Sequence, residues 1–569
     1  MIVPQASLSL VTLFLLFTTV ANAALRTFNF TLHSGLRAPD GFRREVYLIN
    51  GQQPGPLIEV EEDDILEVTV KNDLDVENTI HWHGLFQRGS PQMDGTPGVT
   101  QYPIPPGGTY TYRFSTANQY GFYWYHSHVR AYYDDAIRGG LLIHPSPSRS
   151  RSFQSLARNA TDVTKLLRAE RKAVSILLND WTHELSDTIY SQYFRTGAYP
   201  FCVDSILANG FGRVQCLPEA VLQAGTGLGI SQTPVTATQA TSTSMSSSAM
   251  TAMSSSTMAA MSSSTMAAMS SSTMAAMSSG TMAGMSSDAM AAMSSNTMAA
   301  MSSNAMASMP MSTGLSPRGC MPPDMFRPGY NSSSLPPDTC TNTTSPLLNI
   351  LADSTDGWLA LNLVNSGGVS MLRVSLDSHS MFVYMADGLY VDIQEANVIE
   401  MSIGQRYSVL IRLDQAPGSY ALRYATYPTG DMQQVLEGHS IVTYSDNIIP
   451  AVGCQPDPSG VYMLVNGSAV AGASTLQAEK LAPFSGNTPP KTANLTKVFT
   501  INQTDITDWV VNKQPYSEAK TPILFDNSTI LATDTTIPLP FNSTVDVIMT
   551  IANDSMDMVP ALCYVVPDK

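Results

Sequence analysis

Short β-type runs, separated by turn residues, recur along most of this sequence and limit the fold classes open to it. β-branched and aromatic residues alternate with Gly, Pro, Asn and Asp in REVYLING, TYTYRFST and GFYWYHSH, near the start of the chain. The same texture returns in RYSVLIRLD and GSYALRYATY, and again in KVFTINQT and STVDVIMTIAND. Short strands at such spacing are typical of β-sandwiches and β-barrels. We therefore predict an all-β chain of three units, the last of them short.

Composition predicts where these units begin and end. An apolar run from Leu8 to Val20 ends in Ala21-Asn22-Ala23, which is typical of a secretory signal peptide cleaved after Ala23. The predicted divisions are a signal peptide (1–23), a first domain (24–150), an Arg-, Lys- and Ala-rich linker with some helical character (151–172), a second domain (173–460) interrupted by an insert (224–317), another linker (461–494) and an incomplete third domain (495–569).

The insert has a different composition from the rest of the chain. From Met245 to Ser308 it repeats an eight-residue unit of the form MSSSTMAA, rich in Ser and without aromatic residues. Eight residues advance an α-helix about 80° beyond two turns, so its methionines would not form one stripe. We predict a disordered and O-glycosylated segment.

Each junction of the repeat keeps a Met-x-x-Met pair, as in MAAM and MASM. Thioethers are soft ligands that prefer Cu(I) to zinc or calcium. Two interpretations stay open: a flexible insert produced by expansion of a short DNA repeat, or a tract that binds Cu(I).

Charge and sequons indicate the compartment and exclude one class of partner. The chain has 30 Lys plus Arg against 46 Asp plus Glu, a net charge of -16 that repels nucleic-acid phosphates. After the signal peptide, no segment is long and apolar enough to span a membrane. We predict a secreted, extracellular or cell-wall glycoprotein. The N-x-S/T sequons are at Asn29, Asn159, Asn331, Asn342, Asn466, Asn494, Asn502, Asn527, Asn542 and Asn553.

Six cysteines in an exported chain predict disulfides. Their spacing leaves the pairing open. Cys202 could pair with Cys216, or either of these with Cys320 or Cys340, whereas Cys563 is the candidate for an odd cysteine.

Two His-x-His motifs, HWH at 81–83 and HSH at 126–128, stand out in a chain with nine histidines. Alternate residues of a strand share one face, so each motif presents two imidazoles together, and neighbouring strands would bring all four together. His81, His83, His126 and His128 therefore predict a transition-metal site rather than isolated structural histidines. The aromatic residues beside them are expected to be core on the opposite face: Trp82, Phe122, Tyr123, Trp124 and Tyr125.

Longer segments resemble the fungal multicopper oxidases, the group of laccases, ascorbate oxidases, pigment oxidases and iron-transport oxidases. LINGQQPGPLIEV, NTIHWHGLFQRGSPQMDGTPGVTQYPIPPGGTYTYRF and QYGFYWYHSH are similar to their first domain, and GWLALNLVNSG, LDSHSMFVYMADGLYV and IGQRYSVLIRLD to their second. The resemblance covers nearly all of 26–555 apart from the insert and linkers. One departure is EEDD, where Asp63 stands in place of the family's Gly.

The resemblance implies tandem cupredoxin-like β-barrels, two complete and the third incomplete, and a trinuclear copper cluster that reduces O2 to water. It assigns His81 to type 2 copper, and His83, His126 and His128 to the type 3 pair. The implied partners are O2 and a small reducing substrate: a phenol, a pigment precursor, Fe(II) or Cu(I). Glu184, in NDWTHELSD, lies where iron-oxidising relatives carry acidic side chains, although a surface glutamate is the favoured interpretation.

The family's late motifs are not found. No histidine follows His439, and no cysteine has a histidine neighbour, so neither H-P-x-H-x-H nor H-C-H occurs and the type 1 ligands are missing. The ending ALCYVVPDK leads us to expect a reading-frame error or a retained intron in the gene model. Two hypotheses stay open: a multicopper oxidase whose catalytic end is lost, or a secreted copper-binding protein without turnover.

Overall fold

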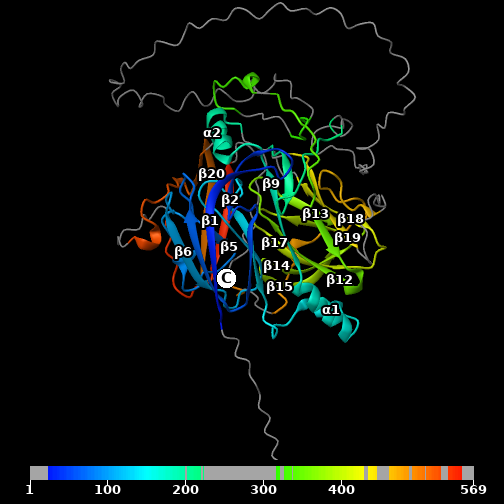
Figure 1. Cartoon of the computed structure of the whole chain (residues 1–569). Coiled ribbons are helices and arrows are strands. Elements are labelled where there is room, and N and C mark those ends of the chain that lie inside the picture. Colours follow the sequence, from blue (N-terminus) through cyan, green and yellow to red (C-terminus); the bar gives the residue numbers. More distant parts are fainter. Residues whose placement is uncertain are drawn as a thin grey trace, which may run out of the picture. The chain divides into compact units, whose positions relative to one another are not determined.

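The computed structural model describes residues 23–198, 202–218, 222, 315–320, 326–335, 337–427, 434–444, 460–485, 490–505, 508–526 and 536–553. Strands dominate these residues (Figure 1), which confirms the all-β prediction. Several predictions lie outside them: the signal peptide, the repeat insert with its Met-x-x-Met pairs, Cys454, Cys563 and the ending ALCYVVPDK. Among the described residues, no helix is long and apolar enough to cross a membrane.

The N-terminal unit is a pair of facing four-stranded sheets. Its β4 strand alternates buried and partly exposed residues, with Leu66, Val68 and Val70 facing a core that also holds Tyr112 and Trp82. This alternation is the pattern of a sheet with one buried face. One sheet has the order β2(Arg44–Ile49), β1(Leu25–Arg37), β4(Ile65–Asn72), β6(Thr109–Ser115), and the other β3(Gly55–Glu61), β8(Arg138–His144), β7(Gly121–His126), β5(His81–His83).

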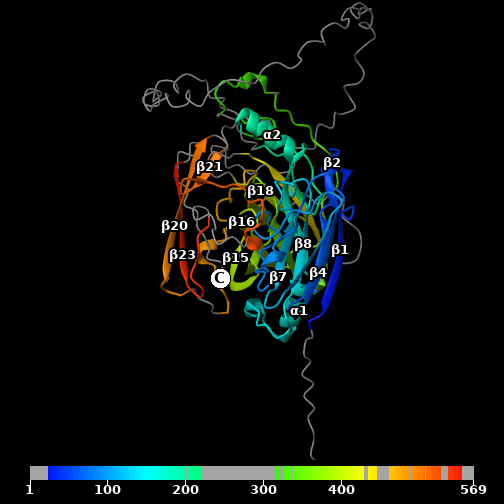
Figure 2. The ribbon, with the colours of Figure 1, turned by 90° about the vertical axis from the view of Figure 1, so that its left-hand side faces the viewer.

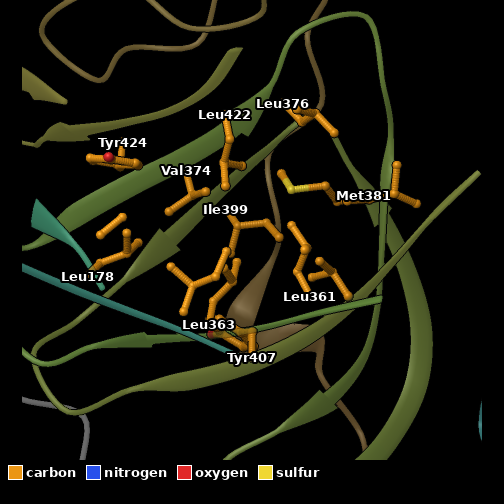
Figure 3. Close-up of a cluster of buried hydrophobic side chains, with 14 of the residues drawn as sticks. Leu178, Leu361, Leu363, Val374, Leu376, Met381, Ile399, Tyr407, Leu422 and Tyr424 are labelled. Carbon is orange, nitrogen blue, oxygen red and sulfur yellow. The ribbon is translucent and has the colours of Figure 1, made fainter. Parts of the chain in front are cut away.

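The central unit is a larger pair of sheets around the core shown in Figure 3. There Leu361, Leu363, Val374, Ile399 and Tyr407 are all at most 1% exposed. The six-stranded sheet has the order β10(Ser205–Ala208), β9(Val174–Trp181), β12(Trp358–Asn365), β17(Arg406–Arg412), β14(Met381–Ala386), β15(Leu389–Ala396). The five-stranded sheet has the order β11(Asn349–Ala352), β19(Glu437–Tyr444), β18(Ser419–Thr426), β13(Leu372–Leu376), β16(Val398–Met401).

Two helices accompany these sheets (Figure 1). Helix α1(Ala160–Arg171) lies in the segment expected to be a linker, and the Asn159 side chain caps its N-terminus. Its buried Leu166 packs in a cluster with Trp358 and Leu410 of the central unit, so this segment is docked on the sheet. Helix α2(Ser186–Thr196) follows β9 and ends at Gly197, whose φ is +79°. The shorter 3-10 helices are η1(Pro91–Met93), η2(Ser152–Leu156), η4(Ser332–Ser334), η5(Ser354–Asp356), η7(Ala478–Lys480) and η8(Ile523–Phe525).

The last described strands form one four-stranded sheet, seen together in Figure 2. Val498, Val511 and Ile548 are respectively 54%, 43% and 46% exposed, so apolar side chains of this sheet remain uncovered by the described residues. The order of the sheet is β22(Gln514–Pro515), β21(Asp508–Val511), β20(Leu495–Asp505), β23(Val545–Asn553). The segment between β22 and β23 contacts the N-terminal unit where the Tyr102 and Phe525 rings stack.

Two disulfides join the segment before the insert to the segment after it. The pairs are Cys202–Cys320 and Cys216–Cys340, so the structure selects among the pairings that spacing left open. Leu222 and Leu315, which precede and follow the eight-residue repeats, also belong to one small cluster. The two ends of the insert are therefore held close together.

The departure at Asp63 has a local explanation. Asp63 has a φ of 75°, a left-handed conformation that favours Gly but that Asp adopts more readily than most residues. Its carboxylate also accepts a hydrogen bond from the backbone N–H of Asn118 at 3.2 Å. The turn therefore keeps its shape without glycine.

Candidate metal centre

The two His-x-His motifs lie side by side because β5 and β7 are antiparallel neighbours. Their register pairs His81 with His126 and His83 with Trp124. Ring nitrogens of His81, His83 and His126 all lie within 4.8 Å of one another. His128 lies just past the end of β7, with its ring centroid 5.2 Å from that of His81 and 6.0 Å from that of His126. The structure thus brings together the four histidines that the motifs predicted.

Backbone carbonyls orient two of these rings. Nδ1 of His81 lies 2.7 Å from the carbonyl oxygen of Asp94, and Nδ1 of His126 lies 2.7 Å from that of Ser127. Because a carbonyl can only accept, each Nδ1 carries the proton and donates it, which leaves the Nε2 lone pair available. Nδ1 of His83 is 3.3 Å from Nε2 of His126, so these two rings face each other directly.

Burial keeps the facing rings neutral. It lowers the pKa of His83 to about 3, with the positive charge of Arg406 acting in the same direction. The pKa of His126 is well below its ordinary value, again mainly through burial, and burial also lowers that of His128. Neutral imidazoles are the form that binds metals, because protonation removes the lone pair.

An acidic side chain adjoins the rim of the site. Oδ2 of Asp94 lies 3.6 Å from Nδ1 of His81 and accepts a hydrogen bond from Thr96 at 2.8 Å. Burial opposes ionisation of Asp94, but contacts with His81 and Thr96 lower its pKa overall. Asp94 therefore holds a negative charge beside the imidazole cluster.

The aromatic residues divide between both faces of β7, which corrects the expectation that all five lie opposite the histidines. Trp82, Tyr123 and Tyr125 are in the N-terminal core as expected. Trp124, however, stacks on His126 with ring centroids 4.1 Å apart, and Phe122 shares its cluster with residues of the central unit. The reason is the two-residue strand period, which puts 122, 124 and 126 on one face.

The central unit contributes two residues that the motifs did not predict as part of the site. A Cβ added to Gly404 would lie 2.8 Å from Cε1 of His83, so this glycine packs directly on the imidazole. Arg406, at the start of β17, donates to the carbonyl of Phe122 at 3.2 Å and is only 6% exposed. The sequence feature that could have identified these two residues is the segment IGQRY, in which a glycine precedes a charged residue at the start of a buried strand.

The remaining histidines have other partners or lie at the surface. His144, His183 and His439 contact carboxylates, His379 contacts Tyr444, and the half-buried His33 contacts the carbonyl oxygen of Ser34. Glu184 is exposed and accepts a hydrogen bond from Gln192. These residues lie outside the imidazole cluster.

The donor set suits a transition metal. Neutral imidazoles without a thiolate fit Cu, Zn, Fe or Ni. The described residues hold one further group of three potential ligands, Cys202, Cys320 and Asp338, but its cysteines form a disulfide. The histidine cluster is therefore the better metal site of the two.

Comparison with known proteins places the histidine motifs in a named family. Residues 32–148 and 350–446 each match a multicopper oxidase family model. A laccase of Pestalotiopsis fici is 29% identical over 506 residues, which cover 89% of this chain and 70% of that protein. Laccase-1 of Emericella nidulans is 27% identical over 547 residues, 91% of this chain and 76% of its own length.

A solved structure agrees on the fold. The laccase from Botrytis aclada superposes with a TM-score of 0.50 at 20% identity, over 86% of this chain and 64% of that one. This chain therefore spans less than two thirds of that solved laccase. At this identity the likeness supports the cupredoxin-like fold alone.

Proposed function

The chain belongs to the multicopper oxidase family, as a relative of fungal laccases, and we propose that it serves copper-dependent oxidation coupled to the reduction of O2 to water. Copper is the metal that the family implies. The observation that carries the proposal is the cluster of ring nitrogens from His81, His83 and His126 within 4.8 Å of one another. The reducing substrates in the proposal are phenols, pigment precursors, Fe(II) or Cu(I), oxidised one electron at a time.

The four histidines have separate roles in the proposal. His81 would hold type 2 copper, while His83, His126 and His128 would hold the type 3 pair. Bound copper would supply the redox chemistry there. The chain's own groups prepare the site: the carbonyls of Asp94 and Ser127 set the tautomers of His81 and His126. Trp124 and Gly404 pack on the rings of His126 and His83.

A second candidate function is copper binding without turnover. Neither H-P-x-H-x-H nor H-C-H occurs in the 569 residues, so this polypeptide by itself supplies no type 1 ligand set of the family's kind. Electrons from a substrate would then have no entry site. A secreted protein that binds copper through the four histidines fits the same geometry.

The repeat insert and the export signals belong to the proposal as well. The Met-x-x-Met pairs of the insert would bind Cu(I). The alternative is that the insert is flexible and binds no metal. The proposed localisation is extracellular or at the cell wall. Asn29, Asn159, Asn331, Asn342, Asn494 and Asn542 are exposed sequons. Asn466 is only 8% exposed, so a glycan there would conflict with the fold.

Two experiments separate the candidates. Sequencing of the transcript beyond the codon for Pro560 supports the enzyme if H-P-x-H-x-H and H-C-H follow in another frame, and a clean stop counts against it. The secreted protein ending at Lys569 should bind copper but show neither blue type 1 absorbance nor O2 uptake with a phenol. Either signal would overturn the binding-only function for this polypeptide, and absence of bound copper would overturn both candidates.

A further inference from the structure

A cavity of about 80 Å³ lies beside the metal centre, and none of the four histidines lines it. Its walls come from the segment after β7, the end of β9, helix α2 and the loop before β13. Tyr133, Asp134, Asp180, Tyr190, Tyr193 and Val369 are among the lining residues. Tyr133 also contacts the ring of His126, with centroids 5.4 Å apart, so the cavity adjoins the imidazole cluster through this side chain.

Two carboxyl groups line the cavity, and none of the described Lys or Arg residues does. Asp180 is fully satisfied, because it accepts backbone hydrogen bonds from Gly368, Val369 and Ser370 at 2.9, 2.8 and 2.7 Å. Asp134 is not. Its Oδ1 is buried without a hydrogen bond, and Nη2 of Arg138 lies 3.6 Å from that atom. The Asp134 side chain keeps 23% exposure and lines the cavity.

The electrostatics of Asp134 favour a cation. Burial raises the pKa of Asp134 well above its ordinary value; the positive charge of Arg138 opposes this rise, and the neighbouring Asp180 carboxylate adds to it. A positive group in the cavity would add to the attraction of Arg138 for Asp134 and relieve the repulsion between the two carboxyls. A neutral ligand could supply a hydrogen bond but would leave that repulsion unchanged.

The walls and mouth are aromatic. Tyr133, Tyr190 and Tyr193 line the cavity, and the faces of such rings attract cations. Tyr190 continues outward to Phe194, with ring centroids 6.2 Å apart and an angle of 27° between the rings. These two side chains are 44% and 53% exposed, so they offer an aromatic surface at the mouth.

Size decides which part of a ligand enters. A cavity of roughly 150 Å³ accommodates benzene, whereas this one has about 80 Å³ and is too small for an aromatic ring. An ammonium group, with a volume close to that of a water molecule, fits. We propose that the cavity binds the ammonium group of an arylalkylamine, with Asp134 as its charge partner and the ligand's ring against Tyr190 and Phe194.

The test uses calorimetric titration of the full chain with two matched probes, phenethylamine and its neutral analogue 2-phenylethanol. The amine should bind and the alcohol should bind at least ~10-fold more weakly, since only the amine pairs with the carboxyl. Asp134→Asn should weaken amine binding by a similar factor. Asp356→Asn, which removes a carboxyl outside the cavity, should leave it unchanged.

A second pair of variants tests the aromatic mouth and does not disturb the buried carboxyl. Tyr190→Phe keeps the ring face and should bind the amine as the wild type does. Tyr190→Leu removes the ring and should weaken binding by about 3-fold to 10-fold. Equal binding of amine and alcohol, no binding of either, or equal affinities of the two Tyr190 variants would each overturn the proposal, even if Asp134→Asn failed to fold.

Discussion

Nδ1 of His83 lies 3.3 Å from Nε2 of His126, and burial makes both imidazoles weaker bases than free histidine. His83 comes from the short strand β5 and His126 from the end of β7, so the contact joins residues 43 apart in sequence. Two neutral rings that face each other with little competition from protons form a site ready for a metal ion. The predictions below test this site and the structure that supports it.

Removal of either facing imidazole should reduce copper binding. His83→Ala and His126→Ala should each lower the apparent affinity for copper by at least ~10-fold, because one ligand of the cluster is lost. Equilibrium dialysis followed by metal analysis measures this. His33→Ala is the matched control, since His33 is outside the cluster. Equal losses in all three variants would contradict the assignment.

Gly404 should affect both stability and copper binding, although it supplies no ligand atom. Its φ is +81°, and a Cβ there would lie 2.8 Å from Cε1 of His83. Gly404→Ala should therefore cost about 1–3 kcal/mol of unfolding free energy and displace the His83 ring. Urea unfolding and copper dialysis are the measurements.

Gly418→Ala provides the control for that substitution, because the nearest atom to a Cβ at position 418 is 3.9 Å away. It should change stability by less than about 1 kcal/mol and leave copper binding intact. A similar loss in both glycine variants would show that the His83 contact is not the cause.

Stability should depend on acid pH through Glu437. Burial opposes its ionisation, but His439 and Arg423 lower its pKa to about 2, from 4.5. The unfolded chain therefore binds a proton at higher pH than the folded chain does. The stabilisation is complete above pH 4.5 and is lost as the pH falls to about 2, with a slope of up to ~1.4 kcal/mol per pH unit.

Glu437→Gln should lower stability at pH 7 and flatten that slope. Glu395→Gln, at an exposed position, should keep the slope of the wild type. Urea unfolding of metal-free protein between pH 2 and 7 gives the comparison. An unchanged slope in Glu437→Gln would assign the acid sensitivity to other groups.

The insert should be replaceable without loss of the β-units. Leu222 and Leu315 pack in the same cluster, and the two disulfides attach the flanking segments. A short Gly-Ser linker in place of residues 224–313 should change the melting temperature by less than about 4 °C. Replacement of both Cys216 and Cys340 by Ser should instead cost about 2–4 kcal/mol. Aggregation of the protein without the insert would refute this independence.

The sequence determined the local features of this protein. Alternating apolar residues predicted the strands, because the side-chain period of a strand is two residues. The same period placed His81 with His83, although the strand that carries His126 ends before His128. The family motifs predicted copper ligands from these residues, and the structure brings their rings together.

Only the tertiary structure decided the contacts between distant segments. The register of β5 with β7 sets His83 against His126, and the packing of the central unit adds Gly404 and Arg406 to the site. Trp124 stacks on His126, whereas the sequence predicted it on the opposite face. Strand pairing and disulfide choice depend on which surfaces bury together, and residue spacing does not specify this. The physical reason is that these contacts join residues far apart in the chain, where local preference has no influence.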